Sequence, residues 1–101
     1  MAYKILITEK AEQDLDGIIQ YLVGKLCNPD AAIHLLDAVE QLYGRLSETP
    51  FMYALCSHSL LSDREYRKAV LGGYLMLYRV EENTVFVERY FSDLEDYIQR
   101  L

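Results

Sequence analysis

Residues 66–87 read YRKAVLGGYLMLYRVEENTVFV, and this stretch decides the fold. Its apolar residues recur with a period of about two, which is typical of β-strands whose two faces differ. The pair Gly72-Gly73 separates two such runs and predicts a tight hairpin turn, and a second turn is predicted at residues 81–83. We therefore expect a meander of antiparallel strands at residues 66–71, 74–80 and 84–91.

Alternation along these strands predicts which side chains share a face of the sheet. Neighbouring residues of a strand point to opposite faces, so Arg67 and Lys68 are expected on different sides. In the last strand the same rule places four residues on one face: Val85, Val87, Arg89 and Phe91.

Upstream of the meander, the apolar period predicts a strand at residues 3–8 and helices at 9–25 and 29–47. Thr8 is suited to cap the first helix, and Asn28 followed by Pro29 is suited to begin the second. The short connection between the helices predicts an antiparallel helical hairpin. Most acidic residues of the helices are expected on solvated faces: Glu9, Glu12, Asp14, Asp16, Asp30, Asp37 and Glu40.

The remaining segments complete the predicted order β-α-α-β-β-β-α. Residues 51–63 are interpreted as an irregular, partly buried crossing, and Asp93 is expected to cap a last short helix. The result is a two-layer α+β fold over residues 1–101, one domain with the helical hairpin packed on an antiparallel sheet joined by the N-terminal strand. The sheet face away from the helices is the expected place for function.

Composition narrows the function. Of the 101 residues, 51% are apolar and 26% charged, which excludes a disordered chain. Ten Lys and Arg against sixteen Asp and Glu give a net charge of −6, which disfavours nonspecific binding to nucleic acids, and we expect no direct sequence-specific DNA binding. No uncharged run approaches the roughly 20 apolar residues that a membrane-spanning helix needs, so a cytoplasmic protein is expected. Cys27 and Cys56 are expected to be small buried hydrophobes.

The whole pattern resembles the RelE/ParE superfamily, the toxins of bacterial type II toxin–antitoxin (plasmid stabilisation) modules. Three segments carry the resemblance: AEQDLDGIIQYL at 11–22, LSETP at 46–50, and the meander at 66–87. It implies an α+β toxin that a small antitoxin holds inactive. We expect that antitoxin to cover the meander and the final helix, and part of residues 51–61 to be exposed without it.

The superfamily has two mechanistic branches. RelE-like members are ribosome-dependent mRNA endoribonucleases, whereas ParE-like members poison DNA gyrase by binding. This chain departs from the ribonuclease pattern, because Leu75 follows Tyr74 where an Arg is frequent, and its C-terminal approach carries Asp93, Glu95 and Asp96 instead of bases. The resemblance therefore favours binding to DNA gyrase. An mRNA endoribonuclease, and a non-toxic interaction module partnered with a small antitoxin, stay open as alternatives.

The candidate site residues are the bases of the meander and one tyrosine. Cleavage of a phosphodiester needs cations beside the phosphate and a proton carrier, which makes Arg67, Lys68, Arg89 and Tyr90 the catalytic candidates. The candidate residues for binding a target or antitoxin are Arg64, Arg67, Lys68, Arg79 and Arg89. The alternative is that these bases form ordinary surface pairs and that the tyrosines are strand formers. His34 and His58 lack metal-ligand spacing, so neither a metal nor another cofactor is expected.

Overall fold

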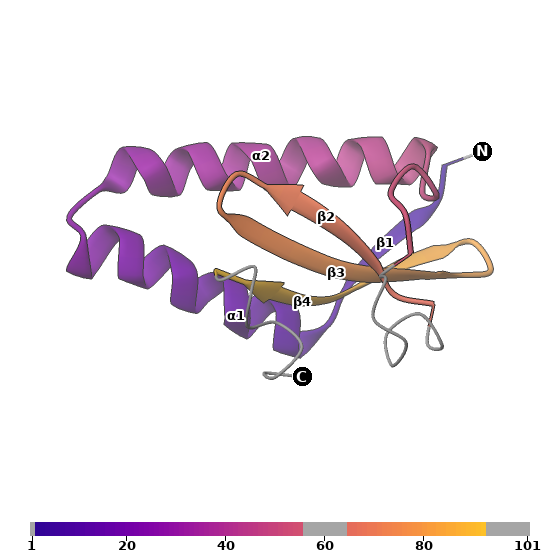
Figure 1. Cartoon of the computed structure of the whole chain (residues 1–101), viewed down its shortest axis with the longest axis horizontal. Helices are drawn as coiled ribbons and strands as arrows, with labels where there is room; N and C mark the ends of the chain where they lie inside the picture. The colour runs from indigo at the N-terminus through magenta and orange to yellow at the C-terminus, as the bar shows by residue number, and fades with distance from the viewer. Residues whose placement is uncertain (1, 56–64, 93–101) are drawn as a thin grey trace.

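The computed structural model describes residues 2–55 and 65–92. Along the chain it contains β1 (Lys4–Ile7), α1 (Glu9–Gln20), a π-helical turn η1 (Tyr21–Lys25), α2 (Pro29–Glu48), β2 (Arg67–Leu71), β3 (Tyr74–Glu81) and β4 (Thr84–Phe91). Figure 1 shows the two helices joined at one end as a hairpin beside the sheet. The predicted final helix and residues 56–63 of the predicted crossing lie outside the described residues.

The strands form a four-stranded sheet in the order β1-β4-β3-β2. The hairpins β2–β3 and β3–β4 are antiparallel, as predicted, and Gly72, with φ +63°, occupies the left-handed conformation that the first turn requires. The N-terminal strand joins the meander as expected, but β1 runs parallel to β4, so the sheet is mixed and not wholly antiparallel. The end of β1 is held there by a bond from the Thr8 amide to the Val87 carbonyl at 3.1 Å.

Both helices begin where their caps were predicted. The Thr8 hydroxyl accepts from the Ala11 amide at 3.1 Å, and the Asn28 side chain accepts from the Ala31 amide at 3.1 Å. Each cap satisfies an amide that has no partner within its helix.

The first helix ends differently from the prediction. The regular α-helix stops at Gln20, and residues 21–25 form one π-helical turn, in which the Leu26 amide reaches back to the Tyr21 carbonyl at 3.0 Å. Cys27 follows with φ +50° and is exposed, so the predicted burial of this cysteine is wrong. It lies at the tip of the helical hairpin, where the chain reverses away from the core. Cys56 lies outside the described residues.

The main core lies between the helices and the sheet. It contains Leu35, Val39, Leu42 and Leu46 of α2, and Met76, Tyr78, Val85 and Val87 of the sheet. Each large side chain buried in this way contributes on the order of 1.5–3 kcal/mol. This layer confirms the predicted packing of a helical hairpin on the sheet.

A β-bulge in β4 overturns the predicted faces of that strand. Leu77 pairs with Arg89 and Tyr78 with Val87, so Glu88 is an extra residue without a partner on β3. Beyond the bulge the alternation is reversed. Tyr90 therefore joins Val85 and Val87 in the main core, whereas Phe91 faces the other side.

The face of the sheet away from the helices holds a second, smaller apolar cluster. Leu75, Leu77 and Phe91 are almost fully buried there, and Tyr66 packs against them. Within residues 2–55 and 65–92, no helix is both long and apolar enough to cross a membrane.

Candidate functional site

The predicted basic residues lie on two faces of the sheet. Arg67 pairs with the core residue Tyr78 and so faces the helix layer, while Lys68 pairs with Leu77 and shares the opposite face. Alternation from Leu77 places Arg79 on that opposite face too. The predicted separation of Arg67 from Lys68 is thus confirmed. Arg64 lies outside the described residues.

Arg67 holds the segment that follows α2. Its Nη1 donates to the Tyr53 carbonyl at 2.7 Å, and its guanidinium carbon lies 5.0 Å from the centroid of the Phe51 ring. The neighbouring Tyr78 hydroxyl donates to the Pro50 carbonyl at 2.9 Å, and burial raises the pKa of Tyr78 to about 12. These contacts tie residues 50–53 to the sheet.

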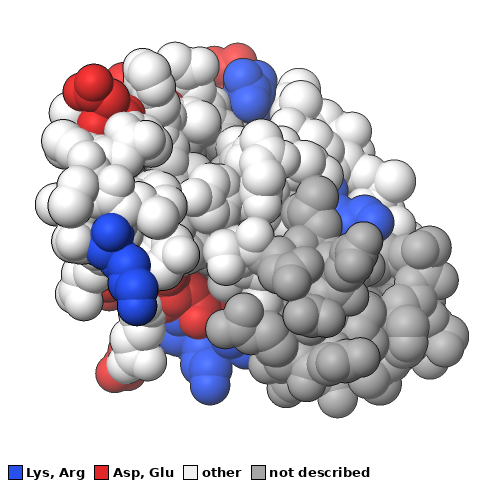
Figure 2. Space-filling view, turned by 60° about the vertical axis from the view of Figure 1, so that its left-hand side comes forward, with Lys and Arg blue, Asp and Glu red and all other residues white. Residues whose placement is uncertain are grey.

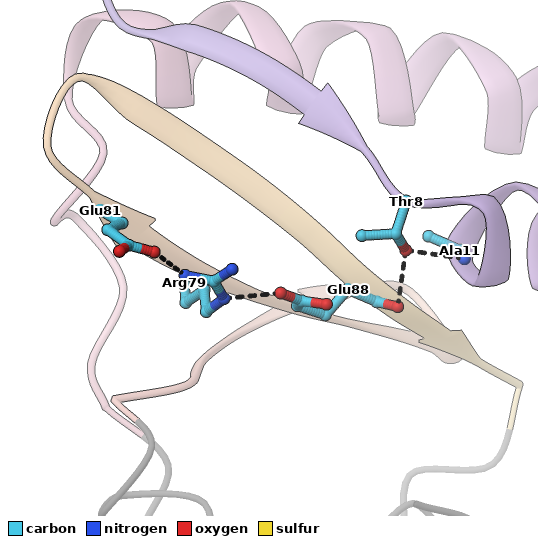
Figure 3. Close-up of polar contacts among 5 residues, drawn as sticks. All are labelled: Thr8, Ala11, Arg79, Glu81 and Glu88. Atoms are coloured by element: carbon cyan, nitrogen blue, oxygen red, sulfur yellow. Dashed lines mark hydrogen bonds and ion pairs between the residues drawn. The ribbon is translucent and has the colours of Figure 1, made fainter.

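Arg79 belongs to an ion-pair cluster on the other face, drawn in Figure 3. Its Nε donates to Glu88 Oε2 at 2.6 Å, its Nη1 pairs with Glu81, and its guanidinium stacks on the Phe86 ring at 4.2 Å. The hydrogen bond to Glu81 is the main cause of the raised pKa of Arg79. The carbonyl of Glu88, freed by the bulge, accepts from the Thr8 hydroxyl at 3.2 Å. Glu88 therefore links Arg79, through its side chain, to the α1 cap residue Thr8, through its carbonyl.

Arg89 connects β4 to α1. Its Nε and Nη2 donate to the Asp14 carboxylate at 2.6 and 3.3 Å, and the Tyr90 amide donates to the same carboxylate at 3.1 Å. The side chains of Arg89 and Asp14 are 15% and 18% exposed. Because this pair is largely buried and has several hydrogen bonds, its role is to fix the position of β4 against α1. It does not present the Arg89 guanidinium as a cation for a ligand.

Tyr90, the predicted proton carrier, is buried. Only 2% of it is exposed, and its hydroxyl is hydrogen-bonded to the hydroxyl of Tyr43 on α2. Burial is the main cause of a strongly raised pKa for Tyr90 and of a raised pKa for Tyr43. Both phenols are neutral at physiological pH, and each satisfies the other across the interface of helix and sheet.

A cleft of about 730 Å³ opens beside α1, toward the turn between β2 and β3. Asp14 and Tyr21 line it from α1, and Tyr74 and Tyr90 line it from the sheet. Asp14, which was expected on a solvated helix face, was the residue that sequence reasoning missed. The signal was present, because Asp14 follows Ala11 by three residues and precedes Ile18 by four, which places it on the apolar face of α1.

Among the predicted basic residues that the structure describes, Arg67, Lys68, Arg79 and Arg89 do not gather in a single basic patch. On the face drawn in Figure 2, Lys and Arg side chains occur at separate places, some of them beside Asp or Glu side chains. In the part of the chain that the structure describes, no group of three or more His, Cys, Asp or Glu residues is arranged to hold a metal ion.

The chain is thus an α+β protein with a helical hairpin packed on a four-stranded mixed sheet, and the ion pair between Arg89 and Asp14 joins the two layers. Residues 5–97 match the family described as the ParE toxin of the type II toxin–antitoxin system, parDE. The chain therefore belongs to the ParE toxin family, which confirms the expected superfamily and the expected role as a type II toxin.

Among the solved structures that share the fold are two toxin–antitoxin systems. The chromosomal ParDE toxin–antitoxin system from P. aeruginosa superimposes with a TM-score of 0.69 at 20% sequence identity, covering 88% of this chain and 94% of that one. The RelBE2 toxin–antitoxin complex from Mycobacterium tuberculosis gives a TM-score of 0.63 at 24% identity, covering 89% of this chain and 96% of that one. A comparison with curated proteins found no match.

Proposed function

We propose that this toxin acts by binding its target, DNA gyrase, and not by cutting mRNA. The observation that carries the proposal is that the four candidates for cleavage do not converge. Arg67 faces the helix layer, Lys68 lies on the other face, Arg89 is paired with Asp14, and Tyr90 is buried.

A cleavage site would need these groups around one phosphate. Negative charge gathers there in the transition state, and the loss of a single stabilising donor typically costs about 10²–10³ in rate. Arg67 and Arg89 are engaged with groups of their own fold, and the Tyr90 hydroxyl already has its partner. The superfamily branch that lacks a basic catalytic set is the one whose members bind gyrase, and membership of the ParE family supports the same choice.

We also propose that a cognate antitoxin is the resting partner. The two solved structures named above are described as a toxin–antitoxin system and a toxin–antitoxin complex. An exposed apolar segment on this chain supports the proposal, since Phe51, Met52 and Leu55 are each about half exposed. This is the described part of the stretch expected to be open when no antitoxin is bound, and such surface typically marks an interface.

The test is induced expression followed by two assays on purified protein. Inhibition of gyrase supercoiling without cuts in ribosome-bound mRNA is the expected result. Cuts in ribosome-bound mRNA that disappear in Lys68→Ala would support the ribonuclease alternative. Activity in neither assay, together with normal growth on induction, would support the non-toxic interaction module.

A further inference from the structure

The cleft beside α1 has aromatic side chains in two of its walls. Tyr21, directly after α1, and Tyr74, the first residue of β3, both line it, and Tyr21 is 53% exposed. Within the described part of the chain, neither of these two hydroxyls makes a hydrogen bond. The cleft volume of about 730 Å³ is within the usual range of ligand sites. The cleft therefore offers two aromatic surfaces to a ligand.

The polar groups of the cleft include acceptors with spare capacity. The Asp14 carboxylate receives its two shorter hydrogen bonds on Oδ2, at 2.6 and 3.1 Å, whereas Oδ1 receives one bond of 3.3 Å from Arg89. Gln13 donates through its amide nitrogen to Glu9 at 3.4 Å, and its amide oxygen accepts from none of the described residues. No described residue in the lining is Lys or Arg. A ligand rich in hydrogen-bond donors is complementary to such a lining.

Gly17 leaves the cleft open on the side of α1. It belongs to the lining, and a Cβ added to it would meet nothing within 4 Å beyond its own helix and its chain neighbours. A glycine inside a helix is destabilising relative to alanine, and no packing among the described residues requires a glycine here. A larger side chain at this position would occupy the cleft without disturbing the fold.

A second hollow, which we call the groove, lies on the other side of α1, between the two helices. It has a volume of about 540 Å³. Apolar side chains and three exposed carboxylates line it: Ile7, Leu15, Leu36, Val39 and Tyr43, with Glu12, Asp16 and Glu40. Water screens exposed carboxylates, whereas Asp14 in the cleft is only 18% exposed. A hydrogen bond to a charged ligand group is therefore screened less in the cleft than in the groove.

We propose that the cleft receives an arginine side chain presented by the toxin's target. The planar guanidinium stacks on the tyrosine rings, and its five N–H donors supply hydrogen bonds to Asp14 Oδ1 and to the Gln13 amide oxygen. A lysine ammonium lacks both the planar surface and the fixed fork of donors, so it is less complementary. The inference rests on the proposed function, because it takes gyrase as that target.

The cleft is separate from the segment that we propose for the antitoxin. Residues 50–53 are tied to Arg67, the first residue of β2, and to Tyr78, which pairs with it. The cleft includes Gly73, beyond the other end of β2. The five residues of β2 span about 16 Å. The two surfaces can therefore bind different partners, and the cleft is assigned to the target.

The first experiment closes the cleft with one substitution. Gly17→Leu adds a side chain to the lining, and Gly44→Leu on α2 is the matched control, because a Cβ at Gly44 also meets nothing within 4 Å and Gly44 lines neither hollow. Both variants should keep or raise the melting temperature, since leucine replaces a helical glycine. We expect half-inhibition of gyrase supercoiling to need at least about tenfold more of the Gly17→Leu toxin, and less than about twofold more of the control.

The outcomes of this experiment separate the two proposals. Equal inhibition by Gly17→Leu and Gly44→Leu would overturn the cleft assignment. Loss of binding to the protein encoded by the adjacent gene in Gly17→Leu, with gyrase inhibition retained, would also overturn it and assign the cleft to the antitoxin. Absence of inhibition by the unmodified toxin would instead overturn the proposed target.

A titration tests the ligand chemistry without the target. The probe is N-acetyl-L-arginine amide, and the control is the matching citrulline derivative, which has nearly the same shape but no charge. We expect the NMR signals of the Gly17 and Gly73 amides to shift with the arginine probe, and to shift much less with citrulline. The same probe should leave the Gly73 signal of Gly17→Leu in place. Equal shifts with both probes, or no shift at the cleft, would overturn the recognition of arginine.

Discussion

The cleft and the groove lie on opposite sides of α1, and they differ in whether their carboxylates form ion pairs. In the wall of the cleft, the Asp14 carboxylate accepts from Arg89 and from the Tyr90 amide. Around the groove, Glu12 and Asp16 make no ion pair within the described residues. Charges that already have partners stabilise the fold, whereas like charges held close together without partners destabilise it slightly.

The first prediction concerns a substitution that removes the ion pair in the wall of the cleft. Arg89→Ala leaves the Asp14 carboxylate poorly exposed and without its guanidinium partner, so we expect a loss of about 2–3 kcal/mol in the free energy of unfolding. Urea denaturation followed by circular dichroism measures it. Arg45→Ala on the exposed side of α2 is the control, with an expected change below about 0.5 kcal/mol. Equal effects of the two substitutions would show that the pair in the cleft does not stabilise the fold.

The second prediction concerns the hydroxyl pair that separates the two hollows. Tyr43 lines the groove and Tyr90 lines the cleft, so Tyr90→Phe removes the partner of a half-buried hydroxyl on the far side. We expect each single change to Phe to cost about 1–2 kcal/mol, and the double change to cost less than the sum of the two. A double-mutant cycle from denaturation data checks this, and strict additivity would argue against the bond.

The third prediction uses pH on the same pair. The pKa values of Tyr43 and Tyr90 are raised in the folded chain, mainly by burial. The folded state then holds protons that the unfolded state releases above pH 10, so stability is fully present below pH 10 and falls as the pH rises further. The slope is about 1.4 kcal/mol per pH unit for each tyrosine that stays protonated only when folded.

Melting temperatures between pH 8 and 11 test this third prediction. The double variant Tyr43→Phe/Tyr90→Phe should show a flatter decline above pH 10 than the original chain. An unchanged slope would mean that other groups govern the alkaline unfolding.

The smallest expected effect is on the groove side. Neutralising Glu12, Asp16 and Glu40 removes repulsion and no ion pair in the described residues, so we expect the free energy of unfolding to rise by a few tenths of a kcal/mol. The same denaturation assay applies. A decrease of more than about 1 kcal/mol in the free energy of unfolding would show that these carboxylates stabilise the fold, as Asp14 does.

Much of the architecture was predictable because its signals are local. The glycine turn, the caps Thr8 and Asn28, and the periods of the helices and strands each depend on a few neighbouring residues. The resemblance to the superfamily supplied the expected role of toxin.

The parts that failed depend on residues far apart in the chain. The parallel pairing of β1 with β4 joins segments 80 positions apart. The alternation of apolar and polar residues is the same in parallel and antiparallel strands, so it does not predict the direction of β1. Strict alternation places Phe91 on the face of Val85 and Val87, whereas the bulge at Glu88 places Tyr90 there and Phe91 on the opposite face. A prediction that does not include the bulge assigns Arg89 to the wrong face of the sheet. The partner of Arg89, Asp14, lies 75 residues away in the sequence.

The bond from Thr8 to Glu88 also has a consequence for the order of events on the ribosome. It joins residues 80 positions apart. β1 and the start of α1 therefore cannot pair with β4 until nearly the whole chain has been synthesised. At about 5–20 residues per second, translation separates the two partners by roughly 4–16 s. During that interval the helical hairpin has been synthesised but has no completed sheet to pack on, so the finished toxin surface exists only after β4 has emerged.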